Sequence, residues 1–187
     1  MPEVPTDPVT RGVRLAVDVG SVRVGLAASD PDGLIATPVA TLARGSLHDG
    51  SRATDVQRIA QEVRDRAAAL VYVGLPRHLS GAEGAAAAAA RAYAGSLARE
   101  VAPVQVRLVD ERMTTVAAHR ALTASGRAGR KHREVVDQAA AVVILQDALD
   151  AERATGRRPG ERVEGDPLRG ALGGPQEDTT TGGETHR

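Results

Sequence analysis

Two apolar runs separated by only a glycine and a serine lie near the start of the chain, in the stretch LAVDVGSVRVGLAAS, residues 15–29. A two-residue connection between such runs is typical of a β-hairpin. We therefore expect antiparallel strands at Val13–Val19 and Val22–Ser29. Asp18 is the exception in the first run, because a carboxylate inside a central strand is costly unless a partner stabilises its charge.

The chain beyond the hairpin alternates between strand and helix patterns. A third strand is predicted at Leu34–Leu42, where Pro38 favours an edge position. Further elements are expected in the order helix 51–69, strand Leu70–Gly74, helix Gly81–Val101, strand Val104–Val109, helix Thr114–Ser125 and helix His132–Arg153. This order predicts an α/β fold with a mixed five-stranded sheet, three strands in an antiparallel meander followed by two parallel strands, and helices on both faces. It is the layout of the ribonuclease H-like fold.

The two ends of the chain differ from this central region in composition. We expect a flexible N-terminal arm over residues 1–12 and a disordered C-terminal tail over 155–187, because neither has enough large apolar side chains to form a core. Residues 13–154 then form one domain. The absence of cysteine excludes disulfides. No apolar run reaches the roughly 18 residues of a membrane span, so we expect a cytoplasmic protein without membrane contact.

Three carboxylates are placed where one site could gather them. Asp18 lies in the first strand, and Glu111 follows the strand Val104–Val109 at its carboxyl end, where open α/β sheets bind ligands. Asp137 lies on the apolar face of the last helix. Hard oxygen ligands suit Mg²⁺ or Mn²⁺, and we predict that the three acids hold two such ions. Asp110 remains a possible ligand, although neighbouring strand residues point to opposite faces and only one of the pair is expected to face the site.

Each acid also has an ordinary structural alternative. Asp18 would pair with Arg23 across the hairpin. Glu111 would interact favourably with the N-terminus of the following helix. Asp137 would pair with Arg133, one turn earlier in its helix.

A basic segment overlaps this region. Residues 107–133 contain seven arginine and lysine side chains against two carboxylates. Such a local excess of positive charge points to partners that contain phosphate. A solvated arginine-rich helix and loop would have the same composition.

Four motifs in chain order resemble those of the YqgF-type Holliday-junction-resolvase-like family, over Val13 to about Ala151. The first-strand motif D-x-G-x-x-R-x-G corresponds to DVGSVRVG at residues 18–25, the V-G-L-P loop to VGLPRHLSGAEG at 73–84, the D-E-R-x-T-T element to VDERMTT at 109–115, and the final K-x-D-x-x-A-A-x-x-I-L helix to REVVDQAAAVVIL at 133–145. The family often has a lysine just before the last helix, where this chain reads GRKHR at 129–133.

This resemblance implies a ribonuclease H-like fold and divalent-metal hydrolysis of phosphodiester bonds. It implies a nuclease in 5′-end maturation of pre-16S rRNA, acting on nucleic acid and on ribosome assembly intermediates, as a monomer or a homodimer. The catalytic and metal-binding acids of the family fall on Asp18, Glu111 and Asp137. Substrate contacts are expected at Arg23, Arg112, Thr115, Arg130, Lys131 and Arg133, with Gly74 and Pro76 as possible additions.

Other functions fit parts of the same pattern. Thr114 or Thr115 would cap the following helix instead of contacting substrate. A Holliday-junction resolvase acting on branched DNA would use the same fold, because RNA helices and branched DNA are both recognised largely by shape and phosphate contacts. The D-x-G hairpin also resembles the first phosphate loop of actin-like ATPases, which need two such lobes. A non-catalytic RNA-binding module would not need the three acids.

Overall fold

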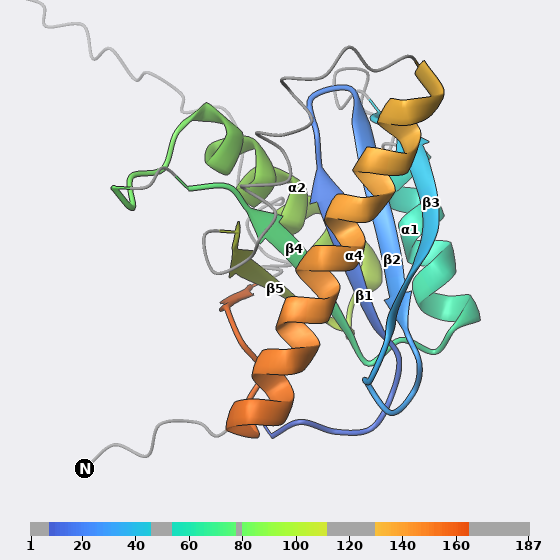
Figure 1. Ribbon diagram of the computed structural model, residues 1–187, viewed down its shortest axis with the longest axis vertical. Helices are drawn as coiled ribbons and strands as arrows, with labels where there is room; N and C mark the ends of the chain where they lie inside the picture. Colours follow the sequence, from blue (N-terminus) through green and yellow to red (C-terminus); the bar gives the residue numbers. More distant parts are fainter. Residues whose placement is uncertain (1–7, 46–53, 78–79, 112–129, 165–187) are drawn as a thin grey trace, which may run out of the picture.

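The computed structural model describes residues 8–45, 54–77, 80–111 and 130–164, except for the side chains of 130–138. Within these ranges the chain folds as an α/β sandwich (Figure 1). Its elements are β1 (Arg14–Val19), β2 (Arg23–Ser29), β3 (Ala36–Ala43), α1 (Thr54–Asp65), β4 (Leu70–Leu75), α2 (Ala85–Val101), β5 (Gln105–Asp110), α4 (Arg130–Thr155) and β6 (Glu161–Val163).

The strands form one mixed sheet in the order β3-β2-β1-β4-β5-β6. β2 is antiparallel to β1 and β3, whereas β4 and β5 run parallel to β1. The predicted hairpin, the two parallel strands and the edge position of the strand that contains Pro38 are therefore confirmed. The predicted count of five strands is wrong, because Glu161–Val163 adds a sixth, antiparallel to β5.

Contacts on both sides of β6 explain why a segment expected in the disordered tail joins the sheet. Gly160 turns the chain with a φ of +82°, and a Cβ at this position would lie 2.2 Å from the Leu108 carbonyl oxygen. The Arg91 guanidinium of α2 then donates to both Glu161 carboxylate oxygens, at 3.0 and 2.9 Å. It also donates to Glu83, whose pKa it lowers to about 2. β6 thereby covers backbone groups of β5 that an edge strand would leave unpaired.

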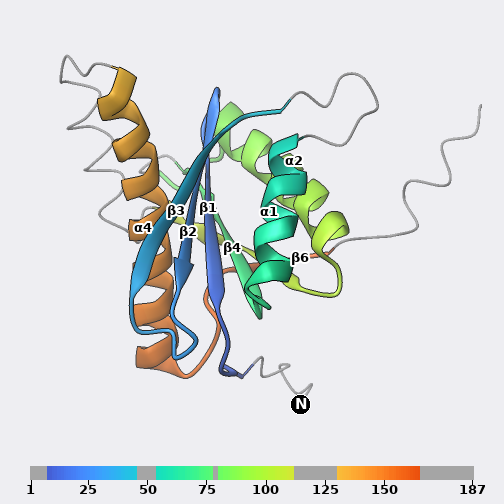
Figure 2. The same cartoon turned by 90° about the vertical axis from the view of Figure 1, so that its right-hand side faces the viewer.

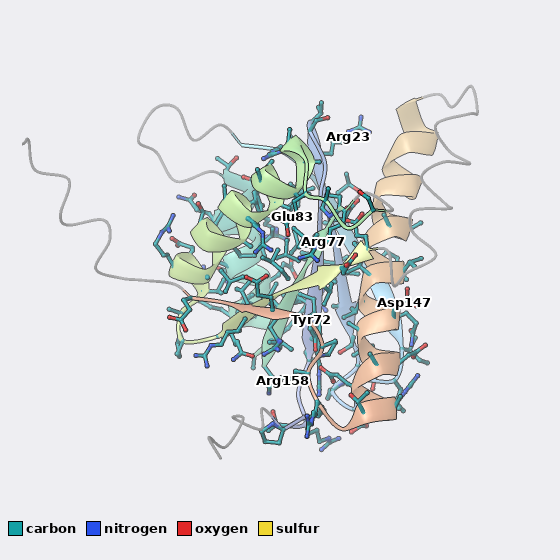
Figure 3. The ribbon with its side chains drawn as sticks, turned by 90° about the vertical axis from the view of Figure 1, so that its left-hand side faces the viewer. Arg23, Tyr72, Arg77, Glu83, Asp147 and Arg158 are labelled. Carbon is teal, nitrogen blue, oxygen red and sulfur yellow. The ribbon has the colours of Figure 1, made fainter. Side chains whose placement is uncertain are left out.

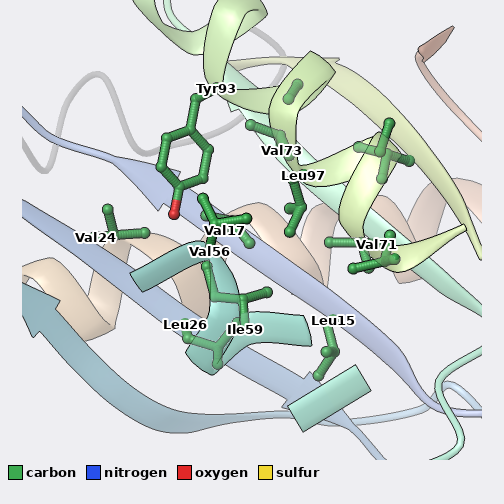
Figure 4. Close-up of a cluster of buried hydrophobic side chains, with 14 of the residues drawn as sticks. Leu15, Val17, Val24, Leu26, Val56, Ile59, Val71, Val73, Tyr93 and Leu97 are labelled. Carbon is green, nitrogen blue, oxygen red and sulfur yellow. The ribbon is translucent and has the colours of Figure 1, made fainter. Parts of the chain in front are cut away.

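Helices cover both faces of the sheet, with α1 and α2 on one face and α4 on the other (Figure 2). Side chains alternate between the faces along each strand. In β1, Leu15 and Val17 join the core beneath α1 and α2, whereas Ala16 packs beneath α4. Figure 4 shows the first of these cores, with the Tyr93 ring among the branched aliphatic side chains.

The two tyrosines lie on opposite faces, and each donates a hydrogen bond to a buried acid. On the α1–α2 side, the Tyr93 hydroxyl donates to Asp55 Oδ2 at 2.9 Å. On the α4 side, the Tyr72 hydroxyl donates to Glu152 Oε1 at 2.5 Å. Burial and the neighbouring carboxylates raise the pKa of both phenols. Both tyrosines thus keep a polar group satisfied inside the core.

The last two predicted helices have different outcomes. α4 begins at Arg130, two residues before the predicted start, so Arg130 and Lys131, expected at the end of a basic loop over 126–131, are helical. The predicted helix Thr114–Ser125 lies outside the described residues. Among the helices that are described, none is long and apolar enough to cross a membrane.

Candidate functional site

Asp18 lies near the end of β1 and is 5% exposed. Alternation along the strand places it on the same face as Ala16, toward α4. Its antiparallel partner on β2 is Gly25, which carries no side chain to cover the carboxylate. The strand pattern that forms β1 therefore holds one acid on the inner side of α4.

Glu111 directly follows β5 and is also 5% exposed. A Cβ built on Gly74 of β4 would lie 2.6 Å from Glu111 Oε1 and 2.7 Å from Ile144 Cδ1 of α4. The Glu111 carboxylate therefore lies over the backbone of β4, on the α4 face. Val73 of β4 is the cross-strand partner of Val17 of β1. The residues that follow these two, Gly74 and Asp18, therefore lie side by side on neighbouring strands. Glu111 thus reaches over the strand next to Asp18, one strand spacing of about 4.8 Å away.

Asp110 points to the opposite face, in line with Leu108 and the core beneath α2. Its Oδ2 lies 3.8 Å from Arg77 Nη1. Arg77 also forms an ion pair of 2.9 Å with Glu83 (Figure 3). Arg77 directly follows the Gly-Leu-Pro bend after β4. Of the two adjacent acids, Glu111 shares the face of Asp18 and Asp110 does not.

The third expected acid lies in α4, the helix that packs across β1, β2 and β3. Asp137 belongs to the helical backbone, but its side chain lies outside the described residues, as do those of Arg130, Lys131 and Arg133. Ala140 and Ala141, one turn further along, are buried against the sheet. The geometry of this part of the predicted site therefore stays a prediction.

The structure describes only some of the predicted substrate-binding residues. Arg23 begins β2 just after the hairpin turn, and alternation with Ala27 puts it on the α4 face. Pro76 follows β4 and is partly buried. Arg112, Thr114 and Thr115 lie outside the described residues.

The described donor set suits a divalent cation. Asp18 and Glu111 provide buried carboxylate oxygens, and the missing side chain at Gly74 lets the Glu111 carboxylate lie close to the β4 backbone. Carboxylate oxygens are the ligands that hard divalent cations prefer in proteins. Among the side chains that are described, no group of three His, Cys, Asp or Glu residues is close enough to hold a metal ion. Asp137, the third expected ligand, is outside that set.

Gly74→Ala tests the close approach of the Glu111 carboxylate to the backbone of β4. The added methyl group would contact both Glu111 Oε1 and Ile144 Cδ1, so we expect a loss of about 1–3 kcal/mol in the free energy of unfolding. Displacement of Glu111 should also weaken Mn²⁺ binding measured by calorimetry.

Gly95→Ala is the matched control for that substitution. A Cβ at Gly95 in α2 would meet only Arg99 Nη1 at 3.9 Å, and alanine favours a helix over glycine by roughly 0.5–1 kcal/mol. Urea unfolding should therefore show a higher free energy of unfolding for this variant. Wild-type Mn²⁺ affinity in Gly74→Ala would contradict the placement of the site.

The family model and the curated relatives together cover most of this chain. The family model described as RuvX, Holliday junction resolvase, matches residues 12–151. A Nocardioides protein named "Putative pre-16S rRNA nuclease" is 58% identical over 82% of this chain and 97% of its own length. A Kineococcus radiotolerans protein of the same name is 59% identical over 82% of this chain and 79% of its own length. Among solved structures, T. thermophilus RuvC in complex with Holliday junction substrate is 17% identical, with a TM-score of 0.45, over 79% of this chain and 99% of that chain.

Proposed function

This chain belongs to the RuvX family of Holliday junction resolvases, and on that premise we propose that it is a nuclease that matures the 5′ end of pre-16S rRNA. The enzyme class is a hydrolase of phosphodiester bonds. Relatives 51–59% identical to this chain are named as nucleases of that rRNA precursor. The proposed substrate of this chain is the rRNA precursor in the names of those relatives.

One observation carries the proposal. Two acids, Asp18 in β1 and Glu111 directly after β5, are buried on the same face of the sheet, and Glu111 lies beside Gly74. Carboxylate oxygens are the preferred ligands of Mg²⁺ and Mn²⁺, so two buried acids on one face suit a metal-dependent hydrolase. Their position at the carboxyl end of parallel strands is where α/β sheets carry ligand sites.

The roles of the residues follow from their chemistry. Asp18, Glu111 and Asp137 would hold two Mg²⁺ or Mn²⁺ ions. When bound between such acids, divalent cations make water a better nucleophile and stabilise the charge on the leaving oxygen. Arg23, on the same face, offers a guanidinium to a phosphate. The basic residues around the start of α4 are assigned to holding the backbone of the substrate.

The architecture supports a ribonuclease H-like assignment. The order β3-β2-β1-β4-β5, with an antiparallel meander followed by parallel strands, matches the layout that the resemblance implies. We assign the nuclease domain to residues 13–154 together with β6, which completes its sheet, with the cytoplasm as its compartment and ribosome assembly intermediates as partners.

Branched DNA is the second candidate substrate, because the matching family model is described as a Holliday junction resolvase. A resolvase would act as a dimer that cuts two strands symmetrically. Cleavage of a four-way junction by a dimer would favour this candidate over the rRNA precursor.

The test uses the full chain with Mn²⁺ or Mg²⁺ on two labelled substrates, a 5′-extended small-subunit rRNA fragment and a four-way DNA junction. We expect cleavage of the RNA, lost in Asp18→Asn. Paired cuts in the junction alone would transfer the proposal to branched DNA. Binding without cleavage of either substrate would overturn it and favour a non-catalytic RNA-binding module.

A further inference from the structure

Arg44 directly follows β3 and makes two hydrogen bonds to the hairpin turn between β1 and β2. Its backbone N–H donates to the Val22 carbonyl oxygen at 2.9 Å. Its side-chain Nη1 donates to the Gly20 carbonyl oxygen at 2.8 Å. Since β2 lies between β3 and β1 in the sheet, the Arg44 side chain reaches past one strand to hold the end of the next.

The turn that Arg44 contacts is tight. The Gly20 N–H donates to the Arg23 carbonyl oxygen at 2.9 Å, and a Cβ at Gly20 would lie 2.7 Å from that oxygen. Both backbone groups of Gly20 are thus bonded, one within the turn and one to Arg44. Removal of the guanidinium would leave the Gly20 carbonyl to water and the turn held only by backbone bonds.

The Arg44 side chain lies on the α1–α2 face of the sheet. Leu42 pairs with Val24, and both pack in the core beneath those helices, so alternation places Arg44 on the same face. Its guanidinium carbon lies 6.0 Å from the centre of the Tyr93 ring of α2, which belongs to that core (Figure 4). A cation over an aromatic face is attracted by the ring. The guanidinium is therefore supported by a helix as well as by the hairpin.

Tyr93 is in turn held from α1. Its hydroxyl donates to Asp55 Oδ2 at 2.9 Å, and Asp55 is 2% exposed. Burial raises the pKa of the Tyr93 phenol, Asp55 raises it further, and the Arg44 cation acts in the opposite direction. The hairpin turn is thus linked through Arg44 and Tyr93 to both helices of this face.

Asp18 lies where β1 depends on that hairpin. The pairing of β1 with β4 ends at Val17, whereas its pairing with β2 continues to Val19. Among the described strands, Asp18 therefore pairs only with β2, one residue before the last pair of the hairpin. Arg44 holds this end of the hairpin from the face opposite to the Asp18 carboxylate. It can thus set the backbone from which Asp18 projects without touching a metal ion or the substrate.

We infer that Arg44 is a positioning residue for the metal site, which fixes the hairpin turn from the α1–α2 face and so orients Asp18 on the α4 face. This inference rests on the proposed function, because the placement of Asp18 matters for cleavage only if Asp18 holds a catalytic ion. It does not require the Arg44 charge to meet a phosphate, since the guanidinium already contacts Gly20 and Tyr93.

Arg44→Gln in the full-length chain tests the inference, because glutamine is shorter and carries no charge to place over the ring. Mn²⁺ binding is measured by calorimetry without RNA, and cleavage of the 5′-extended rRNA fragment in single turnover at saturating RNA. We expect the Mn²⁺ dissociation constant to rise roughly 10-fold and the cleavage rate to fall by a similar factor, the lower end of the effect of residues that orient metal ligands. The salt dependence of RNA affinity, measured without divalent cations, should stay unchanged, because no phosphate contact is lost.

Three variants separate positioning from stability and from charge. Arg44→Lys keeps a cation and a donor, and should restore most of the Mn²⁺ affinity. Tyr93→Phe keeps the ring but removes its hydrogen bond to Asp55, so it should lower the thermal unfolding midpoint and leave the Mn²⁺ affinity at its wild-type value. Arg64→Gln removes an exposed arginine from α1 and should change none of these quantities.

The outcomes distinguish this inference from the proposed function. Wild-type Mn²⁺ affinity and cleavage rate in Arg44→Gln would overturn the inference and leave the proposed nuclease standing. A weaker salt dependence of RNA binding in that variant would also overturn it, by identifying Arg44 as a phosphate contact. An equal loss of Mn²⁺ affinity in Tyr93→Phe would attribute the effect to stability instead. Absence of both Mn²⁺ binding and cleavage in the wild type would overturn the inference and the proposed function together.

Discussion

Replacing Glu111 by glutamine is expected to reduce the rate of RNA cleavage by more than roughly 100-fold, since even outer-shell partners of metal sites cost 10–100-fold. Glutamine has nearly the same shape but no negative charge, so it is a poorer ligand for a hard cation. The fold should survive, because the substitution removes a buried charge without changing volume. Single-turnover cleavage of the 5′-extended rRNA fragment, with thermal unfolding alongside, measures both effects.

The neighbouring residue provides the control for that result. Asp110→Asn changes the adjacent carboxylate, which points to the opposite face and lies 3.8 Å from Arg77. We expect its cleavage rate to equal that of the wild type. If Asp110→Asn loses activity and Glu111→Gln retains it, the site lies on the α1–α2 face of the sheet and our assignment is wrong.

Glu152→Gln is expected to lower the free energy of unfolding by about 3–5 kcal/mol, the cost of breaking one partner out of a buried ion pair. Glu152 accepts from Arg14 Nη2 at 2.9 Å and from the Tyr72 hydroxyl at 2.5 Å, and both charged side chains are 3% exposed. The substitution leaves the Arg14 guanidinium buried without a counter-ion. Urea unfolding should show a lower midpoint concentration, with an unchanged dependence of the unfolding free energy on urea concentration.

Two further variants separate charge burial from packing at this pair. The double change Arg14→Met and Glu152→Met removes both charges and should recover part of the loss, with the Tyr72 hydroxyl left without its acceptor. Asp32→Asn breaks the exposed pair with Arg11, whose side chains are 76% and 56% exposed, and should leave stability unchanged. Wild-type stability in Glu152→Gln would show that the pair does not anchor α4.

The buried pair also bears on the site at the other end of α4. Arg14 begins β1, the strand that carries Asp18 four residues later, and Glu152 lies near the end of the helix that carries Asp137. The ion pair therefore fixes the axial position of α4 along β1. We expect a loss of Glu152 to loosen the placement of the helix that supplies the third predicted acid.

Local patterns in the sequence were enough to predict most of the sheet. The apolar runs around Gly20–Ser21 predicted the hairpin, because strand alternation and a short connection are properties of adjacent residues. The same alternation predicts that Glu111 and Asp110 point to different faces, and the structure places the two on opposite faces.

Only the tertiary structure decided the features whose partners are far apart in the chain. Arg14 and Glu152 are separated by 138 residues, and Arg91 and Glu161 by 70. A side chain's own neighbours carry no information about such a partner, so the tail composition around Glu161 predicted disorder where β6 forms. The sequence by itself determined the strands and their faces, because these follow from local periodicity. The buried ion pair, the sixth strand and the close approach of Glu111 to Gly74 depend on how distant segments pack, because these contacts form only in the folded chain.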